Sequence, residues 1–497
     1  MISTFFGVEI ARRAIQTATD DIAVTGQNIA NASTTGYTEE VAQNTATQPY
    51  TVPSVEDSNP GQFGTGVEVS QITRQVEPWV NQQVNTSNSN LNYWETLNSQ
   101  LQVAQSAFQE PTTIGLQSAM DNFFNSWQTL SEDPTNMGAR ATVVSDATQL
   151  IDDFHTSSAL LSQTAANIQT QMNSDVNGSN SMINQMAAQI ASLNQQIASV
   201  SAQGEQPNDL EDSRDQLISQ LSQLVPVTVQ NYDNGTADVG IFGQSLATSL
   251  GLANTVSLTT VADTVSYSGY DNVLNIGSAT VNLTAPPVAY ASSGGLAGLE
   301  EARQKAGDYL GQLDDLAITL ANQVNTQHEQ GYGLYGTTWA VQGIPFFAAL
   351  SATVGASTSL ALSTTISPNP GGVNPNLDAV AAGAGNTDPR DGNNALAMYN
   401  LQGTTWSVLN NGTFDGYYET VTEAMGADVQ NASQMQQTAS ATNTQLVNMQ
   451  QSVSGVSSDA EMTKLVQYQY AYQAAAQFLS VQDKLLDTLI NGTLSAG

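Results

Sequence analysis

Hydrophobic residues at both ends of the chain recur with the spacing of paired helices. Near the start they lie seven positions apart, at Val8, Ile15, Ile22 and Ile29, and the second core positions of these heptads hold Ala11, Ala18 and Thr25. Near the end they occupy the two core positions of successive heptads, at Leu465, Tyr468, Tyr472, Leu479, Leu486 and Leu489. A repeat of this kind is typical of coiled coils. We predict helices within 1–35 and 455–497 that pack on each other or on neighbouring copies.

Between these ends, residues 80–225 and 297–330 also show helical periodicity. One part has an unbroken coiled-coil spacing of apolar residues, at Ile183, Met186, Ile190, Leu193, Ile197 and Val200. A further helix over 417–450 has a weaker stripe that includes Met435, Thr438, Thr442, Leu446 and Met449. We expect long helices here, the last of them with a weak core.

The pattern changes to that of strands between Val225 and Ala291, where apolar and polar residues alternate. The tripeptide Asp233-Asn234-Gly235 is typical of a hairpin turn. A second irregular stretch, 351–394, is rich in Gly, Pro and Ala. These residues predict a β-rich segment followed later by a loop-rich one.

We therefore predict a mainly α fold with a β-rich insertion. The helices of 1–35 and 455–497 pair as a coiled coil. Residues 36–225 and 292–454 form a helical rod domain, a bundle of long helices with irregular segments. Residues 226–291 form the β-rich domain, to which the loops of 351–394 could contribute.

The charge of the chain limits its partners. The 497 residues include 10 Lys and Arg against 44 Asp and Glu, which gives a formal net charge of −34. Nucleic acids and anionic lipids bind clustered Lys and Arg, and the basic residues here are scattered. We expect neither nucleic acid nor a membrane as a partner.

Cysteine is absent, which excludes disulfides, thiolate metal sites and a Cys nucleophile. The segment Met1–Ile15 has no apolar run of the length of a secretory signal peptide. If the protein leaves the cell, we expect a route other than the ordinary secretory signal.

Candidate catalytic and cofactor sites are weak. The two histidines, His155 and His328, lie far apart in the chain, whereas zinc sites usually use short spacings. The segment Gly243–Ala247 resembles an esterase elbow but ends in Ala instead of Gly. Phosphate-binding glycine motifs are absent from the sequence. We expect no metal, no cofactor and no catalytic residue.

Acidic residues offer two further hypotheses. The pairs Asp152-Asp153, Asp314-Asp315 and Glu300-Glu301 could act as acid and base, but neighbours on a helix point in different directions, so we expect solvated helix faces. The oxygens of Asp388, Asp391, Asn393 and Asn394 could bind calcium. Ordinary turn chemistry is the other explanation of that cluster.

Long helices whose apolar stripe exceeds what their own core covers are typical of self-associating proteins. We expect the terminal stripes to be interfaces between copies. The alternative is a helical pair inside a monomer.

The ends of the chain resemble a known family. The run Asn28-Ile29-Ala30-Asn31-Ala32, followed by Gly36-Tyr37, resembles the N-terminal signature of the rod, hook and hook-associated axial proteins of the bacterial flagellum. The C-terminal run, with Glu461-Met462 and Gln469, is similar to their other signature. Runs within 183–197, 207–217 and 314–347 are similar to one branch, the flagellar hook-associated protein 1 family.

This resemblance implies a structural adaptor that joins the hook to the filament, and no enzyme. Such a protein is exported unfolded through the flagellar type III apparatus, without a cleaved signal peptide. It assembles extracellularly as a ring at the hook tip, between the hook protein and the second junction protein. An export chaperone covers its C-terminal helix beforehand. The terminal helices line an inner tube, the helical rod surrounds it, and the β-rich domain projects outward.

The sequence also departs from the family. After Gly36-Tyr37 the family usually has a hydroxyl residue, a basic residue and Gln, whereas Thr38, Glu39 and Glu40 follow here.

Three alternatives remain at this point. The first is another axial protein, such as the hook protein. The second is a glycosidase on a helical stalk that uses Asp233, Asp263 or Asp271. The third is an adhesin with 232–291 as its head.

Overall fold

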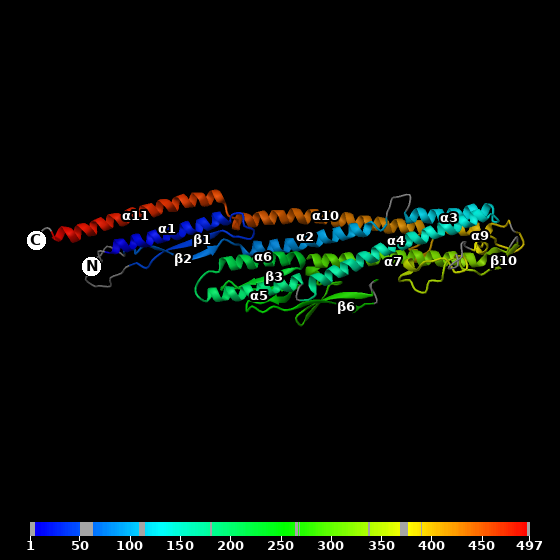
Figure 1. Ribbon diagram of the computed structural model, residues 1–497, viewed down its shortest axis with the longest axis horizontal. Coiled ribbons are helices and arrows are strands. Elements are labelled where there is room, and N and C mark those ends of the chain that lie inside the picture. Colours follow the sequence, from blue (N-terminus) through cyan, green and yellow to red (C-terminus); the bar gives the residue numbers. More distant parts are fainter. Residues whose placement is uncertain are drawn as a thin grey trace. The chain divides into compact units, whose positions relative to one another are not determined.

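The computed structural model describes residues 5–49, 63–108, 115–178, 181–263, 267, 269–335, 338–367, 376–388 and 390–494. The chain divides into two compact units, each built from separate parts of the sequence. Unit 1 comprises Met1–Ser89, Met182–Thr255 and Ser440–Gly497, and unit 2 comprises Asn90–Ser181 and Val256–Ala439. Long helices dominate and the sheets are small, so the prediction of a mainly α fold with β structure in the middle of the chain is confirmed (Figure 1).

The two ends of the chain meet in unit 1. Helix α1 (Phe6–Asn31) packs along α11 (Ser458–Leu494), which confirms the predicted pairing (Figure 1). A hairpin of β1 (Glu40–Ala46) and β2 (Val67–Arg74) packs on α1. Gly36 has a φ of +85° in the turn that leads from α1 to β1, a conformation that glycine adopts without steric cost.

The terminal pair has a shallow seam. On α1 the second core positions of the heptads, Ala11, Ala18 and Thr25, are buried, as is Asn28, whereas Val8, Ile15, Ile22 and Ile29 at the first core positions are only half-buried. On α11, Leu465, Tyr468, Leu479 and Leu486 are half-buried, and Tyr472 and Leu489 are exposed. The pair therefore leaves much of its apolar surface in contact with water.

Unit 1 also contains α5 (Met182–Ser201), α6 (Asn208–Leu224) and the sheet β3 (Val227–Asn231), β4 (Ala237–Ile241), β5 (Gln244–Ala247). The predicted seam of α5 is largely buried, but Leu193 and Val200 are half-buried. Asn194, a polar residue next to Leu193 of this seam, is fully buried. Its amide donates to the carbonyls of Ala237 (2.7 Å) and Thr248 (2.9 Å), and so binds α5 to the sheet.

Unit 2 has the larger apolar core. Helices α3 (Leu116–Glu132), α4 (Met137–Val176), α7 (Gly295–Gln330) and α9 (Asn393–Asn400) surround aromatic side chains, with a short helix α8 (Ala356–Ser359) beside α4 and α7. Phe123, Phe124, Trp127, Phe346 and Phe347 are fully buried. The hairpin β9 (Tyr332–Tyr335) and β10 (Thr338–Gln342) follows α7, in a stretch for which no strands were predicted.

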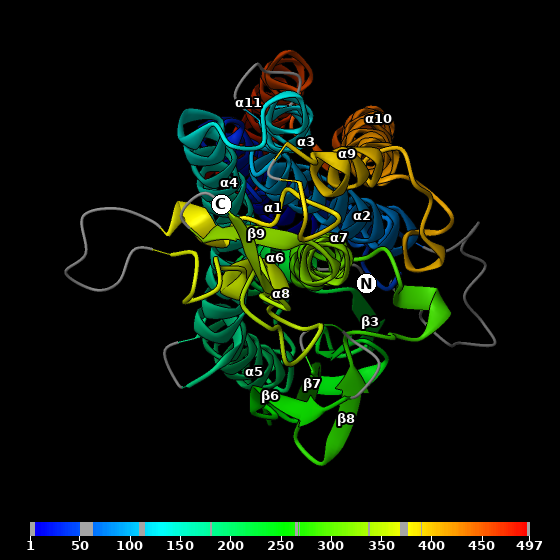
Figure 2. The ribbon, with the colours of Figure 1, turned by 90° about the vertical axis from the view of Figure 1, so that its right-hand side faces the viewer.

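A second three-stranded sheet belongs to unit 2. Strands β6 (Val256–Ala262), β7 (Tyr270–Ile276) and β8 (Ala279–Asn282) lie side by side (Figure 2). The buried Asn272 on β7 donates to the Glu300 carboxylate of α7 (2.6 Å). The strands predicted within 226–291 thus form two sheets in two units, because β3–β5 pack on α5 whereas β6–β8 pack on α4 and α7. The radial layers from inner tube to outer projection stay a prediction.

Helices α2 (Pro78–Gln105) and α10 (Phe414–Ser454) contribute residues to both units. Side-chain amides connect the two helices inside each unit. Gln450 donates to Asn81 in unit 1, and Asn98 donates to Gln436 in unit 2, each with a donor–acceptor distance of 2.8 Å. The weak stripe predicted on this helix is only partly buried: Leu446 is half-buried, whereas Met435 and Met449 are exposed. Its inward positions are Ala432, Ala439 and amides, which a search for large apolar residues does not find.

Among the described residues, no helix combines the length and the hydropathy needed to cross a lipid bilayer.

Candidate functional site

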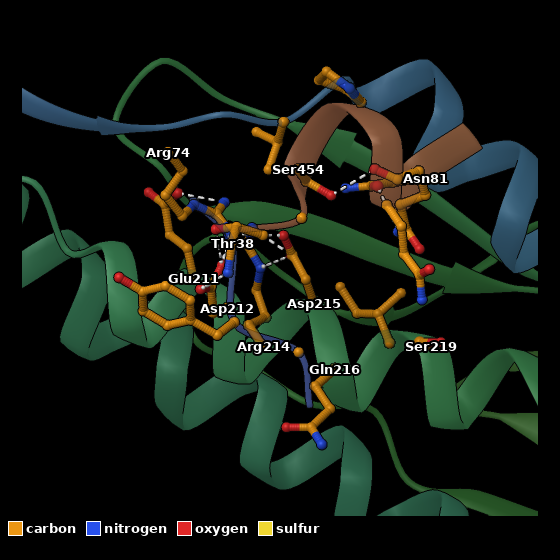
Figure 3. Close-up of a pocket in the computed structure, with 18 of the residues that line it drawn as sticks. Thr38, Arg74, Asn81, Glu211, Asp212, Arg214, Asp215, Gln216, Ser219 and Ser454 are labelled. Atoms are coloured by element: carbon orange, nitrogen blue, oxygen red, sulfur yellow. Dashed lines mark hydrogen bonds and ion pairs between the residues drawn. The ribbon is translucent and has the colours of Figure 1, made fainter. Parts of the chain in front are cut away.

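A polar cluster in unit 1 joins both ends of the chain to its middle. It borders a cavity of about 1080 Å³ (Figure 3). The cavity is lined by the α1–β1 loop, the end of β2, the start of α2, the middle of α6, strand β3 and the joint between α10 and α11. Gly455–Ser457 form this joint. Ser457 immediately precedes α11, and its carbonyl accepts from the Glu461 N–H in the first turn of the helix.

Asn28, at the end of α1, is the centre of the cluster and is only 1% exposed. Its Nδ2 donates to the Glu40 carbonyl (2.8 Å) and to Glu461 Oε2 (2.9 Å). Its Oδ1 accepts from the Glu40 N–H (3.0 Å) and from the Tyr37 hydroxyl (2.8 Å). All four hydrogen-bonding positions of the amide are therefore filled, and one side chain connects α1, β1 and α11.

Lys464 neutralises the buried end of this network. Its Nζ lies 2.6 Å from Glu461 Oε1 and 2.7 Å from Glu39 Oε1. Partial burial lowers the pKa of Lys464, but hydrogen bonds to Glu39 and Glu461 outweigh it and raise the pKa above its usual value. Glu39, which stands where the family usually has a basic residue, is thus paired within the chain.

Arg74, at the end of β2, binds three carboxylates of α6. Its guanidinium lies 2.6 Å from Glu211, 2.6 Å from Asp212 and 3.1 Å from Asp215 (Figure 3). Burial acts to lower the pKa of Arg74, but the three carboxylates raise it. Burial raises the pKa of Glu211 despite the nearby arginines. Asp212 also accepts from the backbone N–H (2.9 Å) and the hydroxyl (2.7 Å) of Thr38.

Two further residues of the same α6 run complete the cluster. Asn208 donates to Glu40 Oε1 (2.7 Å) and to the Ile72 carbonyl (3.0 Å). Arg214 donates to the Gly235 carbonyl (2.5 Å) and to Asp215. The carboxylates of the cluster are thus engaged by arginine, lysine, amide and hydroxyl groups. The arrangement suits the joining of chain segments.

Sequence comparisons give the cluster a context. Residues 101–347 match the model of the flagellar hook-associated protein FlgK helical domain, and residues 449–492 match that of the flagellar basal body rod FlgEFG protein C-terminal region. Flagellar hook-associated protein 1 of Bacillus subtilis is 31% identical, with 99% of each chain covered. The chain belongs to the flagellar hook-associated protein 1 family.

Other members agree with this assignment. Flagellar hook-associated protein 1 of Escherichia coli is 26% identical, with 98% of each chain covered. The fold is similar to that of the flagellar hook junction protein FlgK from Burkholderia pseudomallei, with a TM-score of 0.59 and 19% identity, over 75% of this chain and 100% of that one. The hook-associated protein 1 family is a structural part of the bacterial flagellum and not an enzyme family.

The structure brings together some signature residues of this hook-associated family and leaves others apart. Asn28, Tyr37 and Glu461 share one network. Asn31 bonds locally, to the Gln27 carbonyl and to the Thr34 hydroxyl. Gly36 lines the cavity, and Met462 and Gln469 are exposed.

Sequence reasoning did not identify Arg74, Asp212 or Lys464 as site residues. Asp212 could have been identified, because it lies in the run 207–217 that is similar to the family. Arg74 is an isolated basic residue without a motif. Only the folded chain brings it to α6.

The histidines and acids of the other hypotheses have structural partners. Fully buried His328 bonds to the Ile344 carbonyl through Nδ1 (2.6 Å), and its Nε2 accepts from the Ala381 N–H (2.9 Å). Burial lowers the pKa of His328 to about 4. His155 bonds to the Leu360 carbonyl (2.9 Å). The oxygens of Asp391 accept from the N–H groups of its own turn, those of Ala384, Gly385 and Asn393.

Two of the paired acids contradict the predicted solvated faces. Asp314 is fully buried and accepts from the N–H groups of Gly355 (2.6 Å) and Ser357 (2.7 Å). Glu300 is fully buried in an ion pair with Arg303 (2.6 Å). The prediction was wrong because buried carboxylates can be stabilised by N–H donors that are distant in sequence, as for Asp314, or by a guanidinium one helical turn away, as for Glu300.

Proposed function

We propose that this protein joins the flagellar hook to the filament by assembling as a ring of copies at the hook tip. The curated relatives are named flagellar hook-associated protein 1, and the similar solved structure is that of a flagellar hook junction protein. The neighbouring components are then the hook protein on one side and the second junction protein on the other.

The observation that carries this proposal is the exposed apolar face of α11. Opposite the side that packs on α1, five residues are between 47% and 67% exposed: Met462, Val466, Tyr470, Val481 and Leu485. Helical spacing places them on one broad face. Large apolar side chains exposed together on one helix face favour a protein–protein interface. The stripes predicted as interfaces, which include Ile22 and Leu479, are half-buried and lie on the same two helices, α1 and α11.

The polar cluster has a supporting part in this proposal. It holds α1, the α1–β1 loop and α11 in one register, because Asn28 and Glu461 can bond only when the helices are aligned. A buried polar residue can set register in this way in coiled coils. The signature residues Asn28, Tyr37 and Glu461 therefore keep the assembling surfaces in a defined geometry.

Export and location follow from the same proposal. The protein is secreted unfolded through the flagellar type III apparatus, without a cleaved signal peptide, and acts extracellularly at the hook–filament junction. The absence of cysteine suits a chain that refolds after secretion. A chaperone bound to the apolar face of α11 keeps the chain from associating before export.

Electron microscopy of cells that lack the gene, with an assay for flagellin in the medium, tests the proposal. We expect hooks without filaments, and flagellin lost to the medium. Absent hooks would move the protein to the hook or rod, and normal filaments would exclude a junction role.

Complementation then tests the interface. We expect Ile22→Asp and Leu479→Asp to abolish incorporation while the core within 80–450 stays folded. The exposed Thr19→Asp on α1 serves as the matched control. Normal assembly of either stripe variant would show that the stripes are not interfaces.

A further inference from the structure

Strand β3 has an unpaired edge. It is an outer strand of its sheet, bonded on one side to β4. The bonds at the two ends of this ladder, from Phe242 N–H to the Pro226 carbonyl (3.2 Å) and from Tyr232 N–H to the Thr236 carbonyl (2.9 Å), involve even-numbered residues. Bonded residues alternate along an antiparallel pair. Val227, Val229 and Asn231 therefore direct their N–H and C=O groups away from β4.

Contacts on the free edge agree with this direction. The Val227 carbonyl accepts from Gln82 Nε2 (3.1 Å), on α2. Among the described residues, the N–H and C=O of Val229 and the N–H of Asn231 have no hydrogen-bond partner outside the ladder. Both residues line the cavity of about 1080 Å³. A free strand edge thus opens into a space as large as typical ligand pockets.

The cavity wall adds charge to this edge. Arg74 has a side chain only 7% exposed, and its Nε has no hydrogen-bond partner among the described residues. Asp215 is 30% exposed, more than Glu211 or Asp212, which bind the same guanidinium. The wall therefore offers a cation the partly exposed carboxylate of Asp215, in a cluster where three carboxylates face Arg74 and Arg214.

We propose that the free edge of β3 binds an extended peptide segment of a partner protein as an added strand, with a Lys or Arg side chain of that segment paired to Asp215. Main-chain hydrogen bonds at Val229 and Asn231 supply affinity, as in other strand-addition complexes. This inference stands apart from the proposed junction function, because it rests on the strand edge and the cavity alone.

Charge indicates a different protein as the occupant. The chain has a net charge of −34, and eight of its ten basic residues are already engaged. Seven lie in ion pairs, namely Arg12, Arg13, Arg74, Arg214, Arg303, Lys305 and Lys464. The eighth, Arg140, is buried against backbone carbonyls. A second copy therefore has little basic chain to offer, whereas a basic extended segment complements the site.

A blocked six-residue peptide, Thr-Val-Lys-Val-Thr-Val, is the probe, with the full-length chain as its receptor. We expect it to slow amide hydrogen exchange at Val229 and Asn231. Two N-methylated versions carry the methyl groups on alternate residues. Only one of them should lose binding, because alternate residues of an added strand face β3.

The charge is tested separately. Replacing the peptide Lys by Glu, or Asp215→Asn in the chain, should weaken binding about two- to fivefold, as for a partly exposed ion pair. Asp233→Asn, in the β3–β4 turn outside the cavity, is the matched control and should leave the affinity unchanged.

Three results would overturn the inference. They are unchanged exchange at Val229 and Asn231 in millimolar peptide, equal binding of both N-methylated versions, and slowed exchange that depends on the concentration of the chain alone. The last would make a second copy the occupant.

Discussion

The core of unit 2 and the terminal helix pair of unit 1 stabilise their helices in different ways. In unit 2, fully buried aromatic rings contact one another, such as Phe124 and Phe414, which stack with centroids 5.7 Å apart. In the terminal pair, the seam holds small and half-buried residues, and a polar network fixes one end. The first region completes its core within one chain, whereas the second leaves apolar surface in contact with water.

The largest expected effect is a core truncation in unit 2. Phe124→Ala removes a fully buried ring and leaves a cavity, so we expect a loss of about 3–5 kcal/mol in the free energy of unfolding. Phe478→Ala, on the partly exposed face of α11, is the control and should change it by less than about 1 kcal/mol. Denaturant unfolding measures both. Similar losses would erase the contrast between the two regions.

The buried His328 makes unit 2 sensitive to acid. Its pKa of about 4 in the folded protein lies below the usual 6.5, so the unfolded chain binds the proton first as pH falls. The stabilisation is complete above pH 6.5 and is lost between about 6.5 and 4, by about 3 kcal/mol. Unfolding measured across this range should show a flatter pH dependence for His328→Gln than for the wild type. An unchanged slope in this variant would refute the assignment.

Disrupting the polar network of unit 1 should cost less free energy of unfolding, and its effect should stay near the network. Asn28→Ala leaves the Tyr37 hydroxyl, the Glu461 carboxylate and two backbone groups of Glu40 without their partner, at a cost of about 1–3 kcal/mol. Hydrogen exchange should rise in α1 and the start of α11 and stay unchanged in α3, α4 and α7. Asn31→Ala, which loses only local bonds, is the matched control. Equal effects of the two variants would show that Asn28 does not hold α1, β1 and α11 together.

The smallest effect concerns the Glu39–Lys464 ion pair, which is partly exposed. A double-mutant cycle with Glu39→Gln and Lys464→Gln should give a coupling of about 0.2–1 kcal/mol that decreases with added salt. The single variant Lys464→Gln should cost more than Glu39→Gln, because it also removes the cation next to buried Glu461. The reverse order would show that Glu461 does not need Lys464.

Helix prediction succeeded where apolar residues repeat strongly, and failed where helices pack through small or polar residues. The heptads at the two ends predicted α1 and α11 and their pairing. On α10 the buried positions include Ala432 and Ala439, whereas Met435 and Met449 of the predicted stripe are exposed and its Leu446 is half-buried, so the larger residues did not locate the packed face. The strands near 226–291 were expected as one domain, because alternation reports strands but not the helices on which they pack.

Local pattern alone determined the long helices, the strand-forming middle and the family signatures, since helix and strand periods depend on neighbouring residues. Tertiary structure decided which polar residues meet. Arg74 reaches α6 across more than a hundred positions of sequence, as in its bond to Asp212 (|i−j| of 138), and Asn28 reaches Glu461 across 433. No local signal encodes such contacts, because their energy depends on burial and on partners that only the folded chain assembles.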